Sequence, residues 1–258
     1  MTGDQLAALT GVGEAAIWHA TAVFLRVGPV MALVPGFSEQ SVPVRIRLVL
    51  SLAMTAIVAP ALPVGTPPSG LMDFAGTALA ETACGLVLGL GLRMFVFVLQ
   101  VAGAMAAQAT SLSQILGGAG AEPLPALGHV LVMGGMALAM MMGLHVRVAE
   151  FLIASYDWMP AGRAPVPPDT AAWGVAQVSR AFDLAFRLAM PFVVISVLYN
   201  LTLGVINRAM PQLMVAMVGA PVITLGGMLL LTLLSPLMLR IWFTALEGFL
   251  ADPTGGVR

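Results

Sequence analysis

The stretch LMVAMVGAPVITLGGMLLLTLLSPLML, residues 213–239, contains no charged residue in 27 positions. An α-helix needs about 20 predominantly apolar residues to cross the hydrocarbon core of a bilayer. Inside a bilayer every backbone N–H and C=O group must find its partner within the protein, which favours a helix. The stretch therefore predicts a membrane-spanning helix, and this prediction determines the fold class.

The composition of the whole chain agrees with that stretch. Of its 258 residues, 59% are hydrophobic and 9% are charged, whereas an ordinary soluble domain has about 45–50% apolar and about 25% charged residues. The net charge is −1, and all eleven positive charges are arginines. These values exclude a disordered chain, a nucleic-acid-binding protein and a typical soluble enzyme. They predict an all-α, polytopic integral membrane protein.

Charged residues and turn signals divide the chain into apolar runs, which predict about six helices. The runs are 15–34, 48–62, 74–100, 127–146, 184–203 and 213–239. Between them we expect a turn-rich loop at 64–73, a long apolar connection at 101–126 and a proline-rich, semi-rigid linker at 158–172. Arginines occur in predicted loops on both sides of the spans. The positive-inside rule therefore does not assign one orientation, and the topology stays open.

Chemical motifs are few. There is no His-Glu-x-x-His, Cys-x-x-Cys or phosphate-binding glycine loop, so we expect no catalytic residue, no metal site and no cofactor. The single cysteine, Cys84, lies in an apolar run and is expected to pack as a small hydrophobic side chain. Gly85 and Gly89 form a Gly-x-x-x-Gly pattern that favours close helix packing, within this chain or between subunits.

Charged residues inside the apolar runs carry more information. A charge at the centre of a membrane helix costs about 2.5–3.5 kcal/mol on insertion scales. A partner, water or a place at the end of a span is therefore needed by Arg26, Glu81, Arg93 and Arg187. Asp183 and Arg187 are four residues apart, which predicts an ion pair on one helix face. Arg26 and Glu81 have no local partner. They pair between helices, or each meets a group on another subunit.

Two polar segments mark helix ends. In VPGFSEQSVPVRIRL, residues 34–48, Pro35-Gly36 predicts a turn, Ser41 a helix N-cap and Pro43 a position in the first helical turn. In NLTLGVINRAMPQL, residues 200–213, Arg208 and Gln212 flank Pro211, which predicts a helix break.

These two segments, in this order, resemble the flagellar biosynthetic protein FliR family of type III export gates, which injectisomes share. The resemblance also includes Arg26-x-x-Pro29 and Ala189-Met-Pro191, and it covers about residues 15–245. It implies a non-enzymatic subunit of the bacterial inner membrane and flagellar basal body. It also implies a FliP-like part at about 1–180 and a FliQ-like part at about 181–258.

The resemblance implies partners and site residues as well. FliP and FliQ would form a channel for unfolded flagellar proteins with this chain, and FlhB would surround its entrance. The middle segment would close the channel as a plug, with the candidates Met105, Leu112, Ile115, Leu116, Gly117 and Gly118. The candidates for subunit interfaces are Pro43, Arg45, Arg47, Asn200, Arg208, Pro211 and Gln212.

A second hypothesis stays open at this point. Proline breaks at Pro191 and Pro211, together with the intramembrane charges Arg26 and Glu81, are features of secondary transporters and channels for small solutes. No inverted repeat accompanies them, and the order of the motifs favours the export gate.

Overall fold

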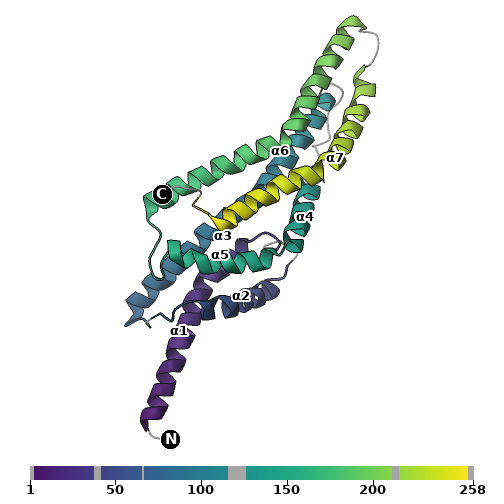
Figure 1. Cartoon of the computed structure of the whole chain (residues 1–258). Helices are drawn as coiled ribbons and strands as arrows, with labels where there is room; N and C mark the ends of the chain where they lie inside the picture. The colour runs from purple at the N-terminus through teal and green to yellow at the C-terminus, as the bar shows by residue number, and fades with distance from the viewer. Residues whose placement is uncertain (1–2, 38–41, 66, 116–125, 211–214, 255–258) are drawn as a thin grey trace. The chain divides into compact units, whose positions relative to one another are not determined.

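The computed structural model describes residues 3–37, 42–65, 67–115, 126–210 and 215–254 of the chain. Every regular element in these ranges is helical, which confirms the predicted fold class (Figure 1). The elements are α1 (Gly3–Leu33), α2 (Val44–Val58), the short 3-10 helix η1 (Ala59–Ala61), α3 (Leu71–Ile115), α4 (Ala126–Met141), α5 (Leu144–Trp158), α6 (Pro167–Ala209) and α7 (Val215–Ala251).

The chain folds as two compact units. Unit 1 comprises Met1–Arg93, Met140–Ala176 and Gly248–Arg258, and unit 2 comprises Met94–Ala139 and Gln177–Glu247. The long helices α3, α6 and α7 each contribute residues to both. The division into a FliP-like part and a FliQ-like part at about residue 180 is a different one, and it stays a prediction.

The core of unit 1 lies among α1, α2, the first half of α3, and α5. Helix α2 follows the extended residue Pro43 and buries Ser51, Met54, Thr55 and Val58, which share one helix face at this spacing. The two hydroxyls on that face donate to carbonyls one turn back, at 2.9 Å and 2.8 Å. They are therefore satisfied within α2 and can pack against α1 and α5.

Unit 2 is held by close approaches of helix backbones. A Cβ atom on Gly103 of α3 would overlap the backbone of Gly128 of α4. Trp242 of α7 is fully buried, and its indole N–H donates to the carbonyl of Phe95 at 2.8 Å. Small residues at such contacts let helices pack where burial of apolar surface from water contributes little.

Two elements differ from the sequence-based expectation. The run 127–146 is not one helix: α4 ends at Met141, Gly143 adopts a left-handed conformation with φ 79°, and α5 begins at Leu144. A glycine reaches positive φ without the steric cost that a Cβ imposes. Helix α5, which extends to Trp158, was missed because its hydropathy is interrupted by charged residues.

The helices are also longer than predicted. Helix α3 continues through the expected connection as far as Ile115. Helix α6 begins at Pro167, inside the expected linker, because proline is tolerated in the first turn of a helix, where its missing N–H needs no partner. Helix α2 begins at Val44, with Pro43 just before it, and Ser41 lies outside the described residues.

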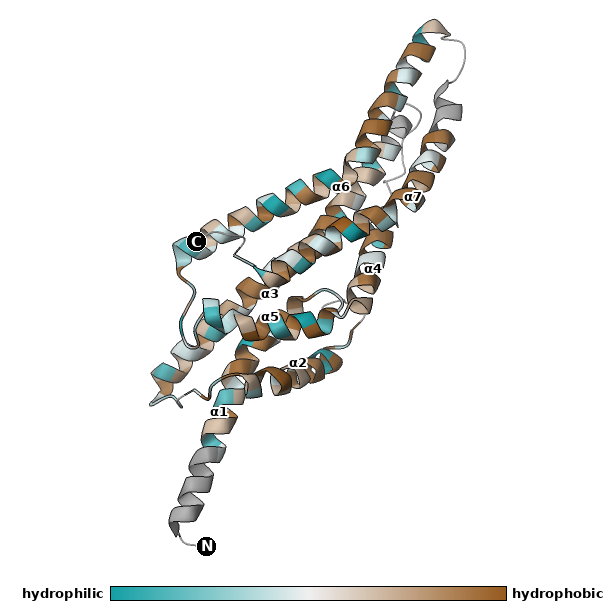
Figure 2. Ribbon diagram, viewed as in Figure 1, coloured by the Kyte–Doolittle hydropathy of each residue, from teal (hydrophilic) through white to brown (hydrophobic). Residues whose placement is uncertain are grey.

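Hydrophobic residues follow all the long helices (Figure 2). Among the described residues, five helices are long and apolar enough to cross a membrane, and a sixth span results if α4 and α5 count as one broken span. This agrees with the predicted number of about six.

Candidate functional site

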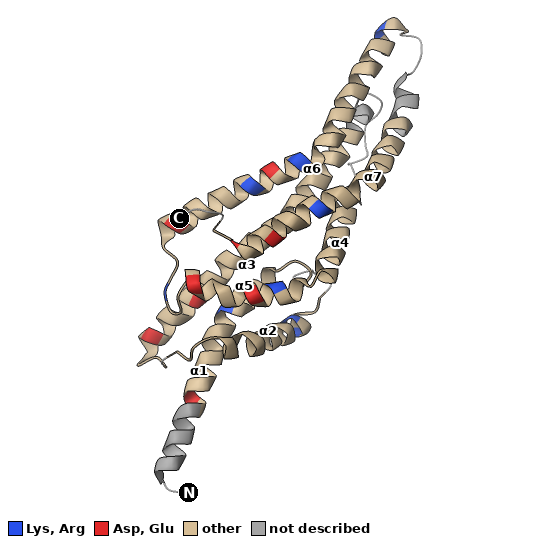
Figure 3. Ribbon diagram, in the orientation of Figure 1, with Lys and Arg blue, Asp and Glu red and all other residues tan. Residues whose placement is uncertain are grey.

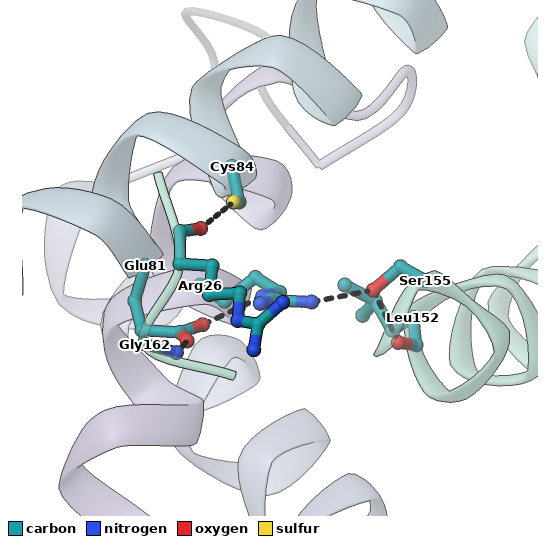
Figure 4. A network of polar contacts seen from close by, with 7 residues as sticks. Arg26, Glu81, Cys84, Leu152, Ser155 and Gly162 are labelled. Atoms are coloured by element: carbon teal, nitrogen blue, oxygen red, sulfur yellow. Dashed lines mark hydrogen bonds and ion pairs between the residues drawn. The ribbon is translucent and has the colours of Figure 1, made fainter. Parts of the chain in front are cut away.

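A buried ion pair lies at the centre of unit 1. Nε of Arg26, from α1, donates to Oε2 of Glu81, from α3, at 2.6 Å. Both residues are buried, with exposed fractions of 0% and 1%. Figure 4 shows the pair with its further partners. The two intramembrane charges that had no local partner in the sequence therefore neutralise each other between helices.

Glu81 also holds the loop that connects α5 to α6. The backbone N–H of Gly162 donates to Oε1 of Glu81 at 2.7 Å, and Gly162 has a φ of 73° that glycine adopts readily. One residue on, the carbonyl of Arg163 accepts from the thiol of Cys84, with a sulfur–oxygen distance of 3.6 Å. The loop is thus fastened to α3 at two points, and both carboxylate oxygens of Glu81 have donors.

Arg26 makes its remaining contacts with α5. Its Nη1 donates to Oγ of Ser155 at 3.3 Å, and its guanidinium lies 3.7 Å from the ring centroid of Tyr156, in cation–π contact. Its Nη2 and the Tyr156 hydroxyl are buried without a hydrogen-bond partner within the described ranges. One side chain of α1 therefore joins α3 and α5.

Glycine makes this arrangement possible. A Cβ on Gly85 of α3 would overlap the carbonyl oxygen of Arg26, and a Cβ on Gly89 would lie 2.9 Å from Leu33. The Gly-x-x-x-Gly pattern thus brings α1 and α3 together within one chain, the first of the two possibilities. Cys84 is fully buried, as expected for a small hydrophobic side chain.

The chemistry of this site is structural. A buried charge that loses its partner costs about 3–5 kcal/mol, whereas an intact pair contributes little net stability. The Arg26–Glu81 pair therefore removes the cost of an unpaired charge where α1 meets α3. Within the described ranges no group of three or more His, Cys, Asp or Glu residues is placed to hold a metal ion.

Sequence reasoning found Arg26 and Glu81 but missed Ser155, Tyr156 and Gly162. Their contacts join residues 129, 130 and 81 positions apart, so no local spacing could indicate them. The proline-rich surroundings of Gly162 predicted only a linker, although a glycine there is a sign of a specific turn.

The predicted pair on α6 is confirmed. Nη2 of Arg187 lies 2.8 Å from Oδ2 of Asp183, and the two side chains are 71% and 58% exposed. This pair differs from the buried one in being open to solvent or to a neighbouring molecule.

The described candidate interface residues lie at the start of α2 and along the second half of α6. In unit 1, Pro43 and Arg45 are exposed at the start of α2, and half-buried Arg47 donates to the carbonyl of Val42 at 3.3 Å. In unit 2, the amide of Asn200 donates to the carbonyl of Ser196 at 2.8 Å, and Arg208 is exposed in the last turn of α6.

The remaining candidates are only partly described. Met105 is half-buried on α3, and Leu112 and Ile115 lie in the last turns of that helix. The connection expected at 101–126 is therefore helical as far as Ile115. Leu116, Gly117, Gly118, Pro211 and Gln212 lie outside the described residues. No contact tests the plug or the interface assignments.

The chain matches the family described as bacterial export proteins, family 1, over residues 17–249. It is 34% identical to the flagellar biosynthetic protein FliR of Caulobacter vibrioides over 230 residues, which cover 88% of this chain and 92% of the relative. It is 26% identical to the protein of that name from Escherichia coli, with 88% and 89% covered. For Bacillus subtilis the identity is 24%, with 77% and 79% covered.

Proposed function

The chain belongs to the family of bacterial export proteins, family 1, and from this membership we propose that it is a subunit of the flagellar protein-export apparatus. The observation that carries the proposal is the extent of the match, which runs through both compact units rather than along one of them. The relatives that match over most of their length share one name, flagellar biosynthetic protein FliR.

A channel-forming role with other subunits is the finer part of the proposal. Helices α3 and α6 have 45 and 43 residues, which corresponds to lengths of ~68 and ~65 Å, about twice the hydrocarbon thickness of a bilayer. Large apolar side chains are exposed along them. The parts of these helices that extend beyond the lipid need protein cover, which favours an obligate hetero-oligomer in the inner membrane.

The partners that we propose are FliP and FliQ in the channel and FlhB at its entrance, with unfolded flagellar proteins in transit. The role that we propose for the chain is structural and non-enzymatic, in line with the relatives of the same name. Met105 and the end of α3 are proposed to contribute to the seal of the closed channel.

The transporter hypothesis loses two of the features that motivated it, whereas Pro211 lies outside the described residues. Helix α6 continues through Pro191 without a break, and Arg26 and Glu81 neutralise each other inside unit 1. A paired, buried charge does not offer a free site for a solute or a proton.

Two measurements test the proposal. A tagged chain is purified from its native membrane in mild detergent, and bound proteins are identified by mass spectrometry. FliP- and FliQ-like proteins are expected in stoichiometric amounts, and a chain bound only to itself would overturn the proposal. In parallel, deletion of the chain should abolish motility and the appearance of flagellar proteins in the medium, with recovery on expression of the wild-type chain.

Two substitutions test whether the segment with Arg208 and Gln212 is a subunit interface. Arg208→Ala and Gln212→Ala should lower the yield of the co-purified complex, while Asp183→Asn on the same half of the chain serves as a surface control. Unchanged yields for both variants would show that this segment is not an interface.

A further inference from the structure

The loop that connects α5 to α6, residues 159–166, lies at the surface of unit 1. Residues 160–164 are exposed, and the loop turns where the N–H of Arg163 donates to the carbonyl of Pro160 at 3.3 Å. Gly162, the third residue of this turn, has a φ of 73°, the positive value that a type II turn requires there. The loop is therefore a compact turn that forms a single layer of chain.

Two hydrogen bonds fasten this turn to α3 in the described part of the chain (Figure 4). The backbone N–H of Gly162 donates to Oε1 of Glu81 at 2.7 Å, and the carbonyl of Arg163 accepts from the thiol of Cys84 at 3.6 Å. A hydrogen bond to a carboxylate is stronger than one between neutral groups, and a thiol is a weak donor. The attachment of the loop therefore depends mainly on one carboxylate oxygen.

That oxygen is also the acceptor that a complete arginine pair would use. The Nε–H and one Nη2–H of a guanidinium lie on the same planar edge, so an arginine commonly engages both oxygens of one carboxylate. Here Nε of Arg26 reaches Oε2 of Glu81 at 2.6 Å, and Nη1 donates to Ser155. Nη2 is buried without a hydrogen-bond partner among the described residues. The loop thus holds Oε1 in place of the second half of the arginine pair.

No second carboxylate is available to the buried Arg26. Charged residues are sparse along α1, α3 and α5 (Figure 3). Glu81 is the one buried carboxylate among the described residues. The other described acidic side chains of these three helices are exposed, namely Glu14, Asp73, Glu150 and Asp157. Arg26 and the loop therefore draw on a single carboxylate.

The carboxyl group of Glu81 can turn between its two donors. The last torsion of a glutamate side chain is broad, without sharp staggered wells, so rotation about it costs little. A turn toward Arg26 brings Oε1 to Nη2 and gives that buried nitrogen a partner, as buried polar groups normally have. Release of the loop is thus compensated inside the core, and both buried charges stay paired throughout.

We propose that residues 159–166 form a releasable strap, in which Glu81 exchanges its bond to Gly162 for a second bond to Arg26 when the strap leaves α3. Release frees the connection between α5 and α6 to move, while Arg26 continues to join α1, α3 and α5. This inference goes beyond the proposed function, since it rests on contacts within one chain and not on export partners.

The single cysteine of the chain reports on the strap. Cys84 is fully buried, but its thiol lies against Arg163, which is exposed, so one layer of chain separates it from the surface. The test measures the rate at which N-ethylmaleimide alkylates Cys84 in the full chain in native membranes. Gly162→Ala should accelerate alkylation about 5- to 30-fold, because a left-handed backbone disfavours alanine by that ratio. An unchanged rate would overturn the proposal.

A matched control applies the same backbone strain elsewhere. Gly143 precedes α5 with a φ of 79°, and no described atom lies within 4 Å of a Cβ added to it. Gly143→Ala should leave the alkylation rate of Cys84 unchanged. An acceleration equal to that of Gly162→Ala would mean that strain anywhere in unit 1 exposes the thiol, which contradicts a strap.

A further substitution distinguishes the exchange from a loosened core. Arg26→Lys keeps the charge but removes the planar fork, so Glu81 has no second donor to turn to and the strap should be held longer. Alkylation of Cys84 several-fold slower than in the wild-type chain is expected. A core that is merely loosened by the substitution would be alkylated faster, and that result would overturn the exchange.

Hydrogen exchange on the unmodified chain does not depend on any variant. The backbone amide of Gly162 is expected to exchange well before the amides of residues 148–155 of α5, because release of the strap leaves that helix intact. Equal protection of the two would show that the loop leaves only when the core unfolds, and would overturn the proposal.

Discussion

The two compact units differ in the polar groups that they bury. Unit 1 buries full charges, and Arg26 uses its guanidinium to join α1, α3 and α5. In the described part of unit 2 no charged side chain is buried, and the buried polar groups are neutral, such as Ser196 and Trp242. A buried charge that loses its partner costs about 3–5 kcal/mol, whereas a buried neutral group that loses its partner costs about 1–3 kcal/mol. The buried contacts of unit 1 therefore depend more strongly on the identity of the partner than those of unit 2.

The largest effect is expected from a substitution that breaks the charge pair of unit 1. Arg26→Met leaves Glu81 buried without its counter-charge, which should lower the free energy of unfolding by about 3–5 kcal/mol. The measurement is helicity by circular dichroism during unfolding in mixed micelles of mild detergent and sodium dodecyl sulfate. The double variant Arg26→Met, Glu81→Met should recover most of the loss, and a double variant as unstable as the single would contradict this role of the pair.

A second comparison uses two closely packed glycines of α3 and two glycines of α3 and α7 that no described atom approaches. Gly85→Ala in unit 1 and Gly103→Ala in unit 2 each push a Cβ of α3 into the backbone of a neighbouring helix. Each should cost about 1–3 kcal/mol, as overpacking does in cores. Gly76 of α3 and Gly226 of α7 have open space around a Cβ, and Ala there should be neutral or stabilise by about 1 kcal/mol. Equal effects at all four positions in the same unfolding assay would show that helix propensity dominates, not packing.

A smaller effect is expected from the loss of a neutral hydrogen bond in unit 2. Trp242→Phe keeps an aromatic ring but removes the donor to the carbonyl of Phe95, which should cost about 1 kcal/mol. Trp173→Phe is the matched change in unit 1, where the indole N–H donates to the carbonyl of Pro253 at 2.8 Å in a half-buried place. Unfolding followed by circular dichroism should rank Trp242→Phe as the more harmful, and the reverse order would contradict the burial difference.

The smallest effect concerns the exposed pair. Asp183→Asn should change the stability of the isolated chain by about 0.5 kcal/mol or less, because i,i+4 pairs open to solvent contribute little and are screened by salt. The measurement is the same unfolding free energy at low and high salt. A loss of several kcal/mol in the isolated chain would mean that the pair is not exposed there.

Much of the fold was predictable from residue order. The charge-free run at 213–239 and the spacing of apolar residues predicted the membrane class and the middle of most helices. The spacing of Asp183 and Arg187 predicted their pair, because four residues make little more than one helical turn. The helix ends were harder to predict. Helix α5 carries charges that interrupt its hydropathy, and α6 starts in a proline-rich stretch that also suits a linker.

The partners of the buried charges were beyond prediction from residue order. That Arg26 and Glu81 needed partners followed from the cost of an unpaired charge among apolar residues. Which partners they have did not follow, because 55 residues separate them and Ser155 and Gly162 come from α5 and a loop.

The sequence by itself determined the all-helical membrane class and the number of spans to within one, because composition and local spacing express the cost of polar groups in lipid directly. Its two polar segments, 34–48 and 200–213, carried the resemblance to the family. Only the tertiary structure decided that Gly85 serves contact within the chain and that Glu81 holds the loop at Gly162. The physical reason is that helix register depends on side chains packing across distances that no local pattern encodes.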